Sequence, residues 1–168
     1  PGYKANRRPV RLNRAEIYKD IPNTKENFNH QVAMCTKMLS KTPIRQIYVP
    51  DCEADDVIGY LCKYRLGDQR KVIVSSDKDF YQLLDKKTII YSPTWKKFVS
   101  FQEVQEKFKI SSQNFCLGKA ICGDSSDNIP GVKGAGFKTI AKRFPKLEEN
   151  NFFTISELIN HCKREIES

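Results

Sequence analysis

The spacing of apolar residues predicts alternating helices and strands in the first half of the chain. Apolar side chains three or four residues apart predict amphipathic helices over 24–40 and 53–66. A short helix is expected through Phe80, Leu83 and Leu84. Apolar runs predict strands over 44–49, 71–76 (buried), 88–92 and 96–101. Because strands alternate with helices, the pattern favours an α/β fold: a parallel sheet with helices on both faces.

The second half of the chain reads as helical, broken by a glycine-rich stretch between Gly123 and Gly136. We therefore expect an α/β core over 1–110 and a helical lobe over 111–168. The first 22 residues are rich in Lys and Arg and poor in apolar side chains, which predicts an exposed basic segment.

Composition narrows the class of protein. The 168 residues carry 29 Lys and Arg against 20 Asp and Glu, and 39% hydrophobic content argues against disorder. No apolar run is long enough for a membrane span, and no secretory leader is visible. The six cysteines form no Cys-x-x-Cys pair and only two histidines accompany them, so we expect free thiols in a reducing, cytoplasmic compartment rather than zinc or disulfides.

Acidic residues follow the predicted strands at the points where each strand ends. Glu53, Asp55 and Asp56 follow the first strand, and Asp77 and Asp79 follow the second. Ligands of open parallel sheets bind at the carboxyl ends of the strands, so both groups are expected at one edge. The sequence GDSSDN supplies a further pair, Asp124 and Asp127.

Each of these acids, taken alone, could simply cap a helix. Seven carboxylates gathered at one edge would repel one another unless cations lay between them. Oxygen ligands without His or Cys favour Mg²⁺ or Mn²⁺. A basic protein around such a pocket suits a polyanion whose phosphodiester is cut at metal ions, although the basic residues could also be an ordinary solvated surface.

The segment PGVKGAGFKTIA (130–141) is the second specific signal. Glycines between two helices can expose backbone N–H groups to a phosphate, whereas a plain helix–helix turn would need only one glycine. Flanking lysines favour contact with a duplex backbone without base readout. The candidate DNA-binding residues are Gly131, Val132, Lys133, Gly134, Gly136, Lys138 and Lys142.

Four segments resemble, in order, the motifs of the 5′-nuclease or flap endonuclease superfamily, of the phage 5′→3′ exonuclease and DNA polymerase I type. They are GYKANR (2–7), CEADDVIGYL (52–61), VSSDKDFYQLL (74–84) and ICGDSSDNIPGVKGAGFKTIAKRF (121–144). The resemblance implies a metal-dependent structure-specific nuclease for DNA with 5′ ends or flaps and for RNA primers, leaving 5′-phosphate and 3′-hydroxyl ends. It implies action in replication or repair, in the cytoplasm of a bacterium or a phage-infected host.

The resemblance also assigns elements and roles. It implies a basic helical arch over about 6–22 and a DNA-binding helix–three-turn–helix element over about 115–144, often around a K⁺ ion. Lys4 and Arg7 match basic residues that offset charge on the transferring phosphate, and Tyr3 matches an aromatic that could stack on a terminal base or simply pack. The family's metal-site acids, for two or more ions, match Glu53, Asp55, Asp56, Asp77, Asp79, Asp124 and Asp127.

One departure from the family pattern concerns the amino terminus. The family has two further aspartates and the first strands of its sheet upstream of the motif at 2–7, and this sequence starts at Pro1. We therefore expect a fragment or a split protein whose missing segment comes from the same or another chain, with weak or no cleavage by itself. The alternative is a non-catalytic module that binds branched DNA. Replication proteins are candidate partners.

Overall fold

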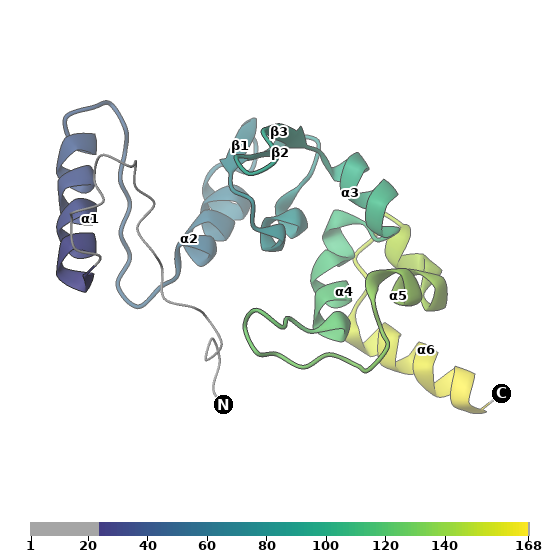
Figure 1. Cartoon of the computed structure of the whole chain (residues 1–168). Helices are drawn as coiled ribbons and strands as arrows, with labels where there is room; N and C mark the ends of the chain where they lie inside the picture. Colours follow the sequence, from purple (N-terminus) through teal and green to yellow (C-terminus); the bar gives the residue numbers. More distant parts are fainter. Residues whose placement is uncertain (1–23, 168) are drawn as a thin grey trace. The chain divides into compact units, whose positions relative to one another are not determined.

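The computed structural model describes residues 24–167, without the side chains of 165–167 (Figure 1). The described residues fall into two compact units, 24–51 and 52–167, which are described separately. The arch expected over 6–22 and the motif at 2–7 lie outside the described residues.

The smaller unit contains the helix α1 (Lys25–Leu39), which confirms the helix predicted over 24–40. Thr24 caps it, because its hydroxyl accepts a hydrogen bond from the backbone N–H of Asn27 at 3.2 Å. The strand predicted over 44–49 is wrong: these residues form no ladder, and Ile44 and Ile47 are exposed. A strand needs a hydrogen-bonded neighbour, and none of the three described strands pairs with this segment.

The sheet of the larger unit contains the strands β1 (Lys71–Val74), β2 (Thr88–Ser92) and β3 (Lys97–Val99), in that spatial order. The prediction of a parallel sheet is correct for β1 and β2 and wrong for β3, which runs antiparallel to β2. The reason is the short connection between β2 and β3: a tight turn, with Lys96 at φ 51°, can only join antiparallel neighbours.

Only one face of the sheet is buried. Ile73, Ile90 and Val99 point into the core. Val72, Val74 and Phe98 lie on the opposite face and are exposed. The prediction that 71–76 is a buried strand is therefore wrong for every second residue of β1, and helices cover one face of the described sheet rather than both.

The remaining elements of the larger unit are helical, as the sequence predicts, and most are short (Figure 1). The helix predicted over 53–66 is split into an α-helical and a π-helical part. In chain order, the helical elements of this unit are α2 (Ala54–Tyr60), η2 (Leu61–Arg65), η3 (Lys78–Leu83), α3 (Phe101–Phe108), η4 (Ser112–Asn114), α4 (Phe115–Cys122), α5 (Phe137–Arg143), η5 (Pro145–Glu148) and α6 (Ile155–Glu167).

Two clusters of buried side chains fill this unit. The first joins the sheet to η3, α3 and α4 through residues such as Ile90, Val104 and Phe115. The second, built on Ile110, Ile140 and Leu147, packs α5 and η5. From residue 24 to 167, no helix is long and apolar enough to cross a membrane.

Candidate functional site

Two of the predicted acids meet at one cation. Lys119 on α4 donates hydrogen bonds to Asp79 Oδ1 and to Asp124 Oδ2, the latter at 2.7 Å. The three side chains are between 23% and 34% exposed, so the cluster is largely shielded from water but still accessible. Asp79 and Asp124 come from distant parts of the sequence, and the fold therefore assembles this cluster.

Local structure explains where the three side chains lie. Asp77 caps η3 at the end of β1, because its Oδ1 accepts from the backbone N–H of Asp79 at 3.0 Å. Lys119 is the only charged residue of the helix FCLGKAIC. Asp124 pairs with Ile129 through two backbone hydrogen bonds of 2.8 Å, which hold the turn that follows α4.

The charges of this cluster stabilise one another. The hydrogen bond from Lys119, followed by that from Ser126, holds the pKa of Asp124 well below its usual range. Burial lowers the pKa of Lys119, but the hydrogen bonds to Asp124 and Asp79 outweigh it, and the net effect raises that pKa. The carboxylate of Asp124 is therefore anionic and the Lys119 amine is protonated at neutral pH.

A pocket of about 400 Å³ brings a second group of acids to Asp79. Asp55 and Asp56 line it from the first turn of α2, and Asp79 lines it from η3. Lys63 and the exposed ring of Tyr60 are also part of its wall. Asp79 follows β1, as the sheet-edge argument expects, whereas Asp55 and Asp56 follow no strand, because the strand predicted over 44–49 does not form. The pocket nevertheless brings acids from two separate segments together.

The other three predicted acids do not line this pocket. Glu53 precedes α2 and is exposed, Asp77 is exposed and caps η3, and Asp127 is buried at 9% exposure. Among the residues that the structure describes, no three His, Cys, Asp or Glu side chains are close enough to hold a metal ion. The donor chemistry nevertheless suits a hard cation, because two carboxylates, those of Asp79 and Asp124, bind the Lys119 ammonium. The metal role of all seven acids stays a prediction.

The three glycines of the loop before α5 differ in how closely the protein packs around them. A Cβ on Gly131 would lie 2.0 Å from the carbonyl oxygen of Cys122, so Gly131 is required by backbone packing within the protein. Gly134 has φ 79°, and a Cβ on Gly134 or Gly136 would meet no atom within 4 Å. The protein itself therefore leaves room at these two positions.

Basic residues surround this open part of the loop. Lys133 lies beside Gly134, and Lys138 and Lys142 lie one turn apart on α5, and all three are exposed. Val132 is also exposed, at 64%. This loop is therefore a basic surface with accessible backbone, and its role in binding DNA stays a prediction.

Sequence reasoning missed Lys119, although a signal for it was present. A lone charged residue in an otherwise apolar helix, five positions before Asp124, needs a partner when the helix packs. Tyr3, Lys4 and Arg7 lie outside the described residues, and their roles stay predictions.

Comparison with known proteins defines the class. Residues 1–109 match the family described as 5′-3′ exonuclease, N-terminal resolvase-like domain. Because this match covers more than half of the sequence, the chain belongs to that family, and the resemblance of its motifs is confirmed.

Individual relatives support the same assignment. The chain is 37% identical over 117 residues to the thermostable DNA polymerase I of Thermus filiformis, covering 69% of this chain and 14% of that protein. It is 30% identical over 148 residues to a 5′-3′ exonuclease of Aquifex aeolicus, covering 83% and 51%. The structure of the T5 D15 protein co-crystallised with metal ions has a TM-score of 0.69 and 26% identity, covering 88% and 53%. The chain thus spans about half or less of each of these proteins.

Proposed function

We propose that this protein is a divalent-metal-dependent, structure-specific 5′-nuclease that cuts DNA or RNA primers near 5′ ends and flaps. The observation that carries the proposal is the contact of Asp79 and Asp124 with the same ammonium group, that of Lys119. Asp55 and Asp56 line the same pocket as Asp79. The family assignment supports this interpretation, because the Aquifex aeolicus relative is named a 5′-3′ exonuclease.

The proposed metal ions are Mg²⁺ or Mn²⁺, held by carboxylates of the seven acids. When bound, such ions supply Lewis-acid stabilisation of a phosphodiester and an activated water. Within the chain, Lys119 reduces the repulsion between Asp79 and Asp124 in the metal-free protein, and Asp77 fixes the turn that carries Asp79. The T5 D15 protein was crystallised with metal ions, which supports a cation requirement.

The proposed duplex-binding element is the helix–three-turn–helix over about 115–144, with a K⁺ ion as a further ligand of its loop. The open backbone at Gly134 and Gly136 and the exposed Lys133, Lys138 and Lys142 support this role. Phosphate contacts of this kind position a duplex without reading its sequence.

The remaining proposed roles rest on the resemblance of the motifs to those of the family. We propose that 6–22 forms the arch over the site, that Lys4 and Arg7 face the transferring phosphate, and that Tyr3 stacks on a terminal base. The products would carry 5′-phosphate and 3′-hydroxyl ends, formed in the cytoplasm during replication or repair, where replication proteins are the expected partners.

The test is cleavage of a 5′-flap duplex by the natural full-length protein with Mg²⁺, compared with its Asp77→Asn and Asp127→Asn variants. Both variants should cut orders of magnitude more slowly and bind the flap duplex almost as tightly. Asp68→Asn, which alters an exposed acid outside the site, serves as the matched control and should cut normally. Cleavage by Asp77→Asn or Asp127→Asn at close to the wild-type rate would remove that residue from the site.

A further inference from the structure

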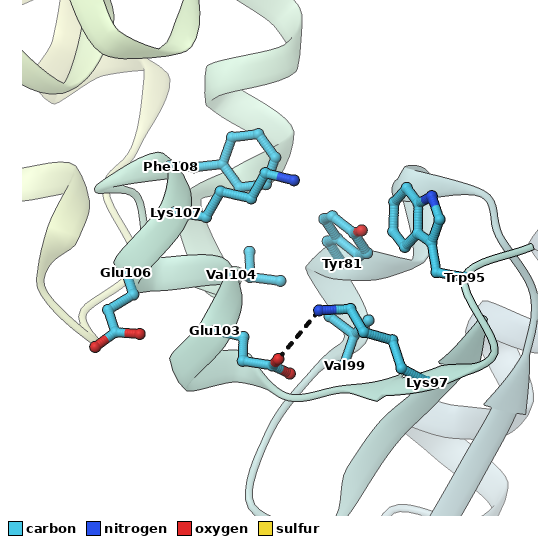
Figure 2. Close-up of a pocket in the computed structure, with 9 residues that line it drawn as sticks. All are labelled: Tyr81, Trp95, Lys97, Val99, Glu103, Val104, Glu106, Lys107 and Phe108. Atoms are coloured by element: carbon cyan, nitrogen blue, oxygen red, sulfur yellow. Dashed lines mark hydrogen bonds and ion pairs between the residues drawn. The ribbon is translucent and has the colours of Figure 1, made fainter.

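A second pocket, of about 530 Å³, lies between the β2–β3 turn and α3 (Figure 2). This volume falls within the range of about 300–1,000 Å³ that is typical of ligand pockets. Its walls include the indole of Trp95, which is 43% exposed, and the ring of Tyr81, while Val99 and Val104 form apolar surface. None of these residues belongs to the carboxylate cluster at Lys119.

The charged groups of the pocket leave one cation available. The Nζ of Lys107 lies over the Trp95 ring, 5.6 Å from its centre, and 5.5 Å from the centre of the Phe108 ring. Among the described side chains, 24–164, no carboxylate forms an ion pair with Lys107. The carboxylate of Glu103 is already engaged by Lys97 at 3.4 Å and by the backbone N–H of Ser100. Figure 2 shows Glu106 directed away from Trp95, whereas Lys107 points toward it.

The pocket lies at the same edge of the sheet as the candidate nuclease site. β1 and β2 are parallel, so Asp77 after β1 and Trp95 after β2 follow strand ends at one edge. The hydroxyls of Ser76 and Ser92 are 2.9 Å apart and connect these two strand ends. The helix η3 separates the two pockets, because Asp79 lines the acidic one and Tyr81 lines this one.

We propose that this pocket binds an unpaired base of single-stranded DNA, which stacks on Trp95 while Lys107 pairs with a neighbouring phosphate. A partly exposed aromatic ring next to a lysine that has no carboxylate partner among the described side chains is the combination that single-stranded nucleic acid recognises. The choice of DNA rests on the proposed nuclease function, which brings a 5′ strand to this edge of the sheet. The hydroxyl of Tyr81, directed into the same space, can hydrogen-bond the base (Figure 2).

The test uses Trp95 as its own reporter, because it is the only tryptophan of the 168 residues. A short single-stranded oligodeoxynucleotide is titrated into the protein, alongside an abasic strand of the same length and phosphate count. Stacking should quench the Trp95 fluorescence with the base-bearing strand only. Equal quenching by both strands, or none with either, would overturn the proposal, because charge alone would then explain any binding.

Two variants separate stacking from charge. Trp95→Leu should weaken binding of the base-bearing strand, measured by anisotropy of a labelled strand, by roughly tenfold or more, since one stacked base contributes that much. Lys107→Gln should weaken it several-fold and flatten its salt dependence. Lys86→Gln removes an equal charge from an exposed position away from the pocket and should have no such effect. Unchanged affinity in Trp95→Leu would overturn the proposal.

The proposed nuclease function can fail independently of this inference. Quenching in a protein that never cuts a flap duplex would leave the base-binding pocket in place and refute the nuclease. Metal-dependent cleavage without base-specific quenching would refute the pocket alone.

Discussion

Replacing Lys119 with Met is the most informative single change, because it removes the cation that Asp79 and Asp124 share. The methionine side chain is unbranched and one atom shorter than that of lysine, and it makes no charge-assisted hydrogen bond. In metal-free buffer the two carboxylates would then face each other without a counter-ion, and the folded state should lose stability.

The structure sets the size of this loss. A hydrogen bond to a charged group contributes about 1.5–3 kcal/mol, and Lys119 makes two of them. Two bonds at the lower end of that range sum to about 3 kcal/mol. Because the side chains involved are 23–34% exposed, solvent screening should reduce the total loss to about 2 kcal/mol. For a chain of this size, that corresponds to a fall in Tm of roughly 4–8 °C.

The assay is thermal unfolding with EDTA and with millimolar Mg²⁺. Because the variant leaves two anionic carboxylates without a cation, Mg²⁺ should stabilise it more than it stabilises the wild type. Lys87→Met, which removes an exposed ion pair with Asp68, is the control and should change stability by less than about 1 kcal/mol with no extra response to Mg²⁺.

The pH dependence of the stability difference between the wild type and Lys119→Met follows from the pKa of Asp124. Because the folded state depresses that pKa, the stabilisation is present above the unfolded value near pH 4 and is lost as the pH falls toward the folded value. The stability gap between wild type and Lys119→Met should therefore be wide at neutral pH and shrink below about pH 4. A variant with wild-type Tm in EDTA, or with no larger gain from Mg²⁺, would refute the reasoning.

Two further predictions concern the helical half. Asn114→Ala should cost about 2–4 kcal/mol in urea unfolding, because the buried amide bonds the backbone at Leu147, Asn151 and Phe153, and a loss below about 1 kcal/mol would contradict this. Gly131→Ala should lower the Tm because its Cβ meets the Cys122 backbone. Gly136→Val should lower the Tm less, because its Cβ meets no atom and only the glycine that caps α5 is lost, and it should weaken duplex binding and flatten its salt dependence. An unchanged salt slope in folded Gly136→Val would place the duplex contact elsewhere.

Local patterns of apolar residues were sufficient to predict most of the helices and strands. The apolar spacing over 24–40 correctly predicts α1, and the runs at 88–92 and 96–101 correctly predict β2 and β3. The strand predicted over 44–49 failed because apolar residues make a strand only with a hydrogen-bonded neighbour, which a local pattern cannot supply. The antiparallel direction of β3 was missed because it depends on the short turn before it.

The site was predictable only in part. The strand-end argument holds for Asp79, which follows β1. Asp55 and Asp56 line the same pocket from the start of α2, although the strand expected before them does not form. Lys119 was missed because its contact with Asp79 joins segments 40 residues apart, although its closeness to Asp124 in the sequence was a usable signal. The Trp95 pocket was missed because it depends on how the β2–β3 turn packs against α3, which apolar spacing does not show. Gly131, which the sequence suggested for DNA contact, also has a packing reason that only the fold reveals.

Binding of Mn²⁺, followed by the loss of its free-ion electron paramagnetic resonance signal, tests most directly whether the carboxylates form a cation site. The wild-type protein should bind Mn²⁺, and Asp79→Asn should weaken that binding by roughly tenfold or more, because an anionic oxygen ligand is lost. Asp68→Asn, which changes an exposed acid outside the pocket, should bind as the wild type does. Equal Mn²⁺ affinity in the wild type and Asp79→Asn would contradict a metal site at this edge of the sheet.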